Sequence, residues 1–186
     1  MHCLESNMGA SGKSEPGLIW PALVKLMLLE NSAKAALEKL KLNLPCSGHN
    51  YMICDKNTSI NVETTALDFD VTFNRSNDSL YFHTNHYVGR LRSKENLKRQ
   101  SPTTLRRHQE IAEYFSKTDV SRIDYQKIAK DVFSGEITKS VCIHPDPKNE
   151  HAAMTCGGLS LDLESSKGVF FEGLYQDQNH LNIDWS

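Results

Sequence analysis

The spacing of apolar residues in the first part of the chain is typical of helices. Pro21 suits the first turn of a helix, and apolar residues follow it at helical intervals as far as Met27. Asn31 or Ser32 can cap a second helix over residues 33–40, which consist of strong helix formers. The pattern therefore predicts two short helices, the first of them with one buried stripe.

From His49 onward, apolar and polar residues alternate with the period of strands. Short polar turns interrupt the alternation, so consecutive strands are expected to pair antiparallel. The last of these strands is apolar and aromatic, and it ends in four consecutive polar residues, His83–His86. The predicted meander has strands at residues 49–55, 59–65, 67–73 and 80–82, with turns at 56–58 and 75–78.

The pattern changes again beyond the meander. A polar, basic loop is followed by Ser101 and Pro102, which are typical of a cap and first turn, and strands return near the C-terminus. Helices, strands, helices and strands in that order, with antiparallel neighbours, predict an α+β fold. The predicted loop covers residues 90–100, the helices 101–116 and 124–133, and the strands 140–144, 154–163 and 169–174, the last two forming a hairpin.

Composition adds limits to this picture. The 186 residues suffice for one domain with a core, and 39% hydrophobic with 24% charged residues is typical of a soluble globular protein. A net charge of −2 argues against a nucleic-acid partner, and the basic run Arg90–Arg107 is diluted by acidic residues, so a solvated face is favoured there. The longest apolar run, Leu18–Leu29, contains Pro21 and Lys25 and is too short to cross a membrane. The first residues resemble no signal peptide.

Five cysteines, an odd number without CxxC spacing, favour reduced structural thiols and a cytoplasmic location. Cys54, Cys142 and Cys156 lie in apolar, strand-like runs and are expected to be buried and inert. Cys46 lies between proline and serine and has no catalytic signature. Cys3 would be a nucleophile only at a new N-terminus, and the residues after it do not look like a strand entering a core.

The polar cluster His83–His86 is the part of the chain that least resembles scaffold. Buried polar side chains without partners each cost roughly 1–3 kcal/mol, so such a cluster is expected at a cleft or a turn. Two histidines at this spacing on a strand end do not share one face, so hydrogen-bonded or exposed histidines are favoured over a metal site. Asn85 is a suitable oxyanion donor. From the residues alone, a turn-forming asparagine is favoured over that role.

The order of residues His83-Thr84-Asn85-His86-Tyr87 resembles the HTNH-plus-aromatic signature of the penicillin acyltransferase-like cysteine hydrolases, which include isopenicillin-N acyltransferases. The resemblance extends over nearly the whole chain. The other segments that carry it are the helical stretch 21–40, Glu63-Thr64-Thr65, Ser101 with Arg106-Arg107, and Cys142-Ile143-His144-Pro145. Some members, the penicillin enzymes among them, have an arginine where this chain has Ile143. This difference argues against penicillin-type substrates and against a catalytic arginine at that position.

The resemblance implies an αββα N-terminal-nucleophile sandwich, and an amide hydrolase or acyltransferase without cofactor or metal. A cysteine freed by self-cleavage attacks an amide or acyl thioester, and the acyl group passes to water or an amine. Asn85 maps to the oxyanion-stabilising asparagine. Thr65, or less well Thr64, falls near a hydroxyl of the site, and His83 and His86 would orient the strand end.

The family's nucleophilic cysteine lies N-terminal to everything matched in this sequence. Residues 1–186 are therefore expected to be the C-terminal portion of a single domain, a sandwich incomplete at its N-terminus and inactive alone. Its partners would be a small-molecule substrate and the missing segment or chain, with no membrane or nucleic acid. The alternative is a non-catalytic soluble α+β interaction module. An incomplete sandwich predicts a bare apolar sheet face, whereas a module predicts covered edges and faces.

Overall fold

A computed structural model of the protein shows two compact units, Met1–Thr104 and Leu105–Ser186. It describes residues 2–7, 14–75, 80–96, 98, 100–119, 121, 124–149 and 154–185. Each unit combines helices with one antiparallel sheet, which confirms the predicted α+β class. The predicted αββα sandwich depends on the relative placement of the two units and stays a prediction. Across the described ranges, no helix is both long and apolar enough to cross a membrane.

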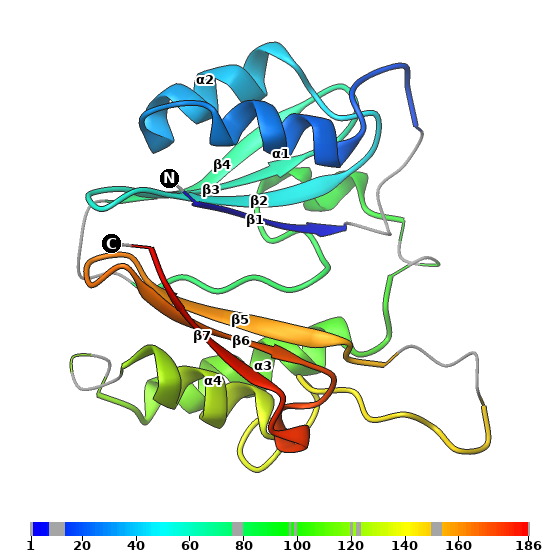
Figure 1. Ribbon diagram of the computed structural model, residues 1–186. Helices are drawn as coiled ribbons and strands as arrows, with labels where there is room; N and C mark the ends of the chain where they lie inside the picture. The colour runs from blue at the N-terminus through cyan, green and yellow to red at the C-terminus, as the bar shows by residue number, and fades with distance from the viewer. Residues whose placement is uncertain are drawn as a thin grey trace. The chain divides into compact units, whose positions relative to one another are not determined.

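The first unit is a four-stranded sheet with two helices on one of its faces (Figure 1). As predicted, Pro21 lies in the first turn of its helix, and the Ser32 hydroxyl caps the next helix by accepting from Ala35 N at 3.2 Å. A short 3₁₀ helix, η1 (Arg90–Lys94), follows the sheet. In chain order the other elements are β1 (His2–Asn7), α1 (Trp20–Leu28), α2 (Ala33–Leu42), β2 (His49–Cys54), β3 (Ser59–Thr64) and β4 (Phe69–Arg75), and the sheet order is β1-β2-β3-β4.

The face of this sheet beneath α1 and α2 holds the apolar core of the unit. Tyr51 on β2 and Ile60 and Val62 on β3 have no exposed surface, and they pack with Leu23 and Leu40 of the helices. Each large apolar side chain buried in this way contributes about 1.5–3 kcal/mol. The apolar residues of the helices and of the strands therefore form one core on one face of the sheet. The opposite face is free for other contacts.

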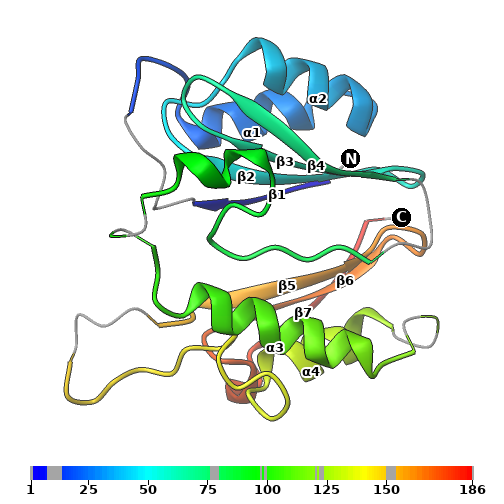
Figure 2. The same ribbon diagram turned by 180° about the vertical axis from the view of Figure 1, so that it is seen from behind.

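The second unit is a three-stranded sheet with α4 packed on one face (Figure 2). Asp124 caps α4 by accepting from Lys127 N at 2.7 Å, and the Phe133 ring of α4 lies 5.3 Å from the Phe171 ring of β6. The elements are α3 (Thr104–Ser116), α4 (Tyr125–Phe133), β5 (Gly157–Asp162), β6 (Lys167–Glu172), the 3₁₀ turn η3 (Tyr175–Asp177) and β7 (His180–Asp184), and the sheet order is β5-β6-β7.

The other face of this sheet carries an exposed apolar row. Leu159, Phe170 and Leu181 lie opposite one another in register across the three strands, and they are 37%, 39% and 62% exposed. Phe171, the next residue along β6, points to α4 and is 0% exposed. Successive residues of a strand point to opposite faces, so the row lies on the face away from α4. We define these three residues as the apolar row.

Two predictions about the first sheet are wrong. Residues 80–82 are extended but form no strand; instead the Tyr81 hydroxyl contacts Asn61 and Thr72 side chains. The fourth strand is β1, which pairs with β2 along its whole length, so the residues after Cys3 do form a strand. An edge strand has only one neighbour, and its sequence shows little alternation. The predicted turn at 75–78 lies almost wholly outside the described residues.

In the second unit, the predicted strand at residues 140–144 is also wrong, because side chains take the backbone donors that a ladder would use. Glu110 accepts from both the backbone N and the hydroxyl of Ser140 at 2.7 Å, and the Thr155 hydroxyl accepts from Ile143 N at 2.9 Å. The predicted helices and the β5–β6 hairpin are present, whereas β7 was not predicted, although its apolar residues Leu181 and Ile183 alternate with polar ones.

Candidate functional site

The face of the first sheet opposite α1 and α2 is polar and buried. On β3, Ile60 and Val62 belong to the apolar core, while Asn61 and Glu63 alternate with them and are also 0% exposed. The extended segment around residues 80–89 lies along this polar face (Figure 2). A strand buried on both faces, one of them polar, requires that its side chains find specific partners.

Glu63 makes three of these contacts. Its Oε1 accepts from Val88 N at 2.6 Å and lies 2.9 Å from His83 Nε2, and its Oε2 accepts from Gly89 N at 3.0 Å. A buried carboxylate is stable only when it is paired and hydrogen-bonded, and these donors meet that need. Glu63 thus ties a strand of the sheet to both ends of the polar segment.

A second hub is the hydroxyl of Thr104, at the start of α3. It accepts from Asn85 N at 2.8 Å, and it lies 3.1 Å from His86 Nδ1 and 3.0 Å from the Thr84 hydroxyl. The Thr84 hydroxyl in turn donates to Thr104 O at 3.1 Å. Next to this hub, Tyr87 is fully buried and donates its hydroxyl to a β3 carbonyl, that of Thr64, at 2.8 Å. The HTNH residues are therefore fixed through side chains and backbone alike.

Farther along the same face, Asn61 organises a network of neutral groups. Its Nδ2 donates to Asn50 Oδ1 and to the Thr72 hydroxyl, both at 2.7 Å, and lies 3.0 Å from the Tyr81 hydroxyl. Burial raises the pKa of Tyr81, and a hydrogen bond with Thr72 offsets part of that rise. Tyr81 is therefore neutral at physiological pH, and the network anchors the start of the segment.

The predicted site residues fall into two groups. The His83 and His86 rings stack with centroids 6.4 Å apart, and Asn85, half-buried, lies between them in the chain. The Thr65 hydroxyl instead belongs to the β3–β4 turn, where it accepts from Leu67 N at 3.3 Å. The Thr64 hydroxyl donates across the sheet to the carbonyl of His49 at 2.9 Å. The structure thus brings the HTNH residues together on one face, and the two threonine hydroxyls bond elsewhere.

Two residues of this arrangement were not predicted as site residues. Glu63 carried a usable signal, because a charged residue inside an alternating strand must find a buried partner or face solvent. Thr104 carried none, since a threonine near a helix start is an ordinary capping residue. His83 and His86 are hydrogen-bonded, as predicted, and no cluster of three or more His, Cys, Asp or Glu suited to a metal exists in the described part of the chain.

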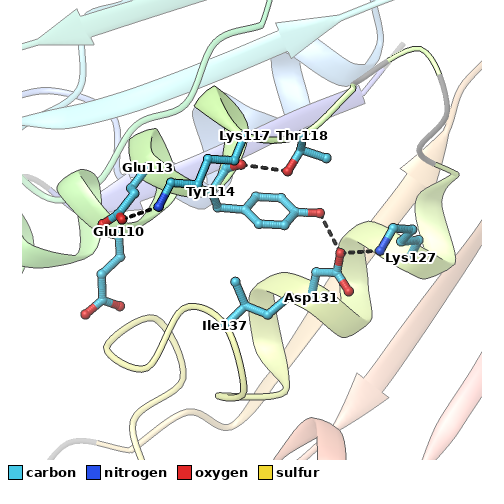
Figure 3. Close-up of a pocket in the computed structure, with 8 residues that line it drawn as sticks. All are labelled: Glu110, Glu113, Tyr114, Lys117, Thr118, Lys127, Asp131 and Ile137. Carbon is cyan, nitrogen blue, oxygen red and sulfur yellow. Dashed lines mark hydrogen bonds and ion pairs between the residues drawn. The ribbon is translucent and has the colours of Figure 1, made fainter.

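The second unit has a cavity of its own. It has a volume of about 440 Å³ and lies at α3 and α4 (Figure 3). At its wall Asp131 Oδ2 accepts from the Tyr114 hydroxyl at 2.7 Å and from Lys127 Nζ at 2.6 Å. Burial, then the bond to Asp131, raises the pKa of Tyr114 to about 12. Each of these groups has a partner. The cavity contains none of the predicted site residues; its lining comprises Glu110, Glu113, Tyr114, Lys117, Thr118, Lys127, Asp131 and Ile137.

The cysteines that the structure describes are free thiols. Cys142 is buried, as predicted, and Cys54 is half-buried on β2, where burial raises the pKa of its thiol despite a bond with Ser59. Cys156 is exposed, so its predicted burial is wrong, because it precedes β5 and lies outside the sheet. Its thiol makes a weak hydrogen bond of 3.6 Å to Met154 O.

The buried polar face that holds the HTNH segment is the candidate functional site of the first unit. The profile of the acyl-coenzyme A:6-aminopenicillanic acid acyltransferase family matches residues 18–156. This range covers most of the chain and contains Glu63, the whole HTNH segment and Thr104. The chain therefore belongs to this family, as the HTNH resemblance predicted. No curated protein matches the sequence.

Proposed function

We propose that this chain forms the oxyanion-binding part of an acyl-transfer site that acts on small-molecule amides or acyl thioesters. The observation that supports it is the anchoring of Asn85. Buried hydrogen bonds from β3 hold the segment on both sides of it, and Thr104 accepts from its backbone N. Family membership supports the reaction class, and the acyl-coenzyme A in the family's description supports a thioester donor.

In the proposed reaction a cysteine thiolate attacks the acyl carbon, and the carbonyl oxygen becomes an oxyanion. The side-chain amide of Asn85 donates to that oxygen. The collapse of the intermediate expels the amine or thiol and leaves an acyl-enzyme, which water or an amine then attacks. A donor of this kind contributes about 10²–10³ in rate. His83 and His86 orient the segment, and Thr65 remains a weaker proposal as a site hydroxyl. No cofactor is required.

The attacking thiol is proposed to lie outside the described cysteines, on a residue freed by self-cleavage. A nucleophilic thiol needs a lowered pKa. Burial raises the pKa of Cys54, and Cys142 is 2% exposed. On this proposal residues 1–186 are part of a single catalytic domain, inactive alone, whose partner is the segment with the nucleophile. The free thiols support a reducing compartment such as the cytoplasm.

The alternative function, a non-catalytic interaction module, predicts a sheet whose faces are covered. The apolar row on β5, β6 and β7 favours the acyl-transfer proposal, because an incomplete sandwich leaves such a face for further structure to cover.

The reaction class is tested by assaying the protein expressed from its complete gene with an acyl-coenzyme A and with acyl anilides, with and without iodoacetamide. The proposal expects turnover that the alkylator abolishes, with transfer to added amines. It also expects that residues 1–186 alone show no alkylator-sensitive turnover. Turnover that survives alkylation would contradict the cysteine mechanism, and alkylator-sensitive turnover by the isolated chain would contradict the missing nucleophile.

A further inference from the structure

One buried side chain holds both ends of the segment that contains Asn85. Glu63 has no exposed surface, and its carboxylate contacts His83, two residues before Asn85, as well as the backbone N–H groups of Val88 and Gly89, three and four residues after it. Within the described residues, the other ring nitrogen of His83 is buried without a partner. Glu63 therefore makes the hydrogen bond that orients this ring, which also stacks on Tyr81 and His86.

The close approach at the Gly89 end requires glycine. A Cβ at this position would lie 2.2 Å from Asp70 Oδ2, 2.5 Å from Thr72 Cγ2 and 3.1 Å from Glu63 Oε2. A larger residue would force these side chains or the backbone of the segment to shift, and either shift disturbs the bond from Gly89 N to Glu63. The contact is thus specified from both sides, by a buried acid on β3 and by a residue without a side chain on the segment.

We infer that Glu63 is a positioning residue for Asn85, an inference that rests on the proposed function. The carboxylate fixes the segment at His83 and at Val88–Gly89, so only the few residues between these points can move. It thereby determines where the Asn85 amide points. A misplacement of about 1 Å in a catalytic group can cost about 10²-fold in rate. Glutamine cannot replace it, because its single acceptor oxygen would leave an NH₂ group facing a backbone N–H.

The first experiment compares Glu63→Gln with Asp68→Asn in the protein expressed from its complete gene. Asp68 is an exposed carboxylate that bonds the Arg90 side chain at the end of the same segment, so its variant removes a charge nearby without touching the buried contact. We expect Glu63→Gln to lower kcat by about 10²-fold with KM changed less than about twofold. The control should keep kcat within about twofold. A purely structural role would lower the melting temperature and leave kcat at low temperature unchanged, which would overturn the inference.

A double-mutant cycle separates this inference from the proposed function. If Glu63 acts through Asn85, adding Glu63→Gln to Asn85→Ala should lower kcat by less than about threefold further, because coupled residues are not additive. The same large loss in both backgrounds would overturn the positioning role. An Asn85→Ala variant with unchanged kcat would instead refute the proposed function.

Hydrogen exchange gives a readout independent of activity and of the folding of the variant. In the wild-type protein the amides of Val88 and Gly89 should exchange as slowly as those of β3, although they lie in a coil. In Glu63→Gln they should exchange at least about tenfold faster while α1 amides keep their protection. If Glu63→Gln does not fold, Gly89→Ala disturbs the same contact from the segment side and should also lower kcat. Wild-type exchange at the rate of open loops would overturn the inference.

Discussion

The two sheets of the molecule differ in the face that lies opposite their covering helices. In the first sheet, α1 and α2 cover an apolar face, and the opposite face is polar and closed by the segment around His83–Gly89. In the second sheet, α4 covers one face, and the opposite face presents the exposed apolar row. Both sheets thus have one ordinary helix-covered core, and they differ in what lies on the other side.

The difference shows what each kind of sheet face requires. A buried polar face is unfavourable unless its groups find partners, and the segment supplies some of them, with Tyr81 contacting Asn61 and Val88 N donating to Glu63. An open apolar face is unfavourable in water, and it is typical of a surface that other structure covers. The first sheet therefore carries the proposed site, and the second carries an exposed apolar face.

The largest expected effect is a difference in stability between substitutions at two neighbouring residues, which lie on opposite faces of the second sheet. Phe171→Ala should lower the free energy of unfolding by about 3–5 kcal/mol, because it opens a cavity beneath α4. Phe170→Ala, in the apolar row, should change it by less than about 0.5 kcal/mol. Urea denaturation of both variants measures this contrast. Equal losses would mean that the row is already covered, and the comparison between the sheets would fail.

A smaller effect is expected at the polar hub of the first sheet. Thr104→Val keeps the shape of the side chain but leaves Asn85 N without its acceptor, and should cost about 1–3 kcal/mol. Thr104→Ser keeps the hydroxyl and serves as the matched control, with a loss well below that of valine. Chemical denaturation of the two variants tests this difference. Similar stabilities would show that the hub hydroxyl does not hold the segment.

The smallest effect concerns pH and the cavity of the second unit. Burial alone would raise the pKa of Asp131, but hydrogen bonds from Lys127 and Tyr114 outweigh it and hold the pKa below its usual value. A group with a lowered folded pKa stabilises the fold above its unfolded pKa of about 3.9, and this contribution is lost as the pH falls through the folded value.

Asp131→Asn should therefore destabilise the protein by about 1 kcal/mol at pH 7, and the difference from wild type should shrink below about pH 4. Melting temperatures across this range provide the measurement. Glu136→Gln, an exposed residue of the same unit, is the control and should show no such trend. A pH-independent difference would place the effect of Asp131 in packing and not in charge.

Much of the fold could be predicted because its signals are local. Ser32 and Asp124 were expected near helix starts and do cap α2 and α4, and the alternation of β2, β3 and β4 matched their observed ranges within two residues. These features depend on neighbours in sequence, which periodicity and capping rules describe well.

The wrong strand predictions fall where contacts with side chains distant in sequence determine the backbone conformation. Residues 80–82 were predicted as a strand, yet they pair with no strand of the sheet, and the Tyr81 side chain contacts Asn61 across it. Residues 140–144 failed for a related reason, since Glu110 takes the Ser140 donors. Such contacts span 20 and 30 positions of the chain and leave no periodic trace.

The site shows the same limit. The HTNH residues were predicted from their resemblance to a family, and the family is confirmed by the match over residues 18–156. What the resemblance did not supply is how the segment is held, because Glu63 and Thr104 act from far along the chain. The role of Asn85 itself stays a prediction until its contribution to the rate is measured.

The most direct test of the account is the ratio of kcat between Asn85→Ala and Asn74→Ala, measured with an acyl-coenzyme A in the protein expressed from its complete gene. Asn74 is an exposed asparagine on β4, so its variant controls for the loss of an amide without touching the polar face. The account predicts that Asn85→Ala is slower by about 10²–10³-fold at similar KM. A ratio near one, with both variants folded, would contradict it.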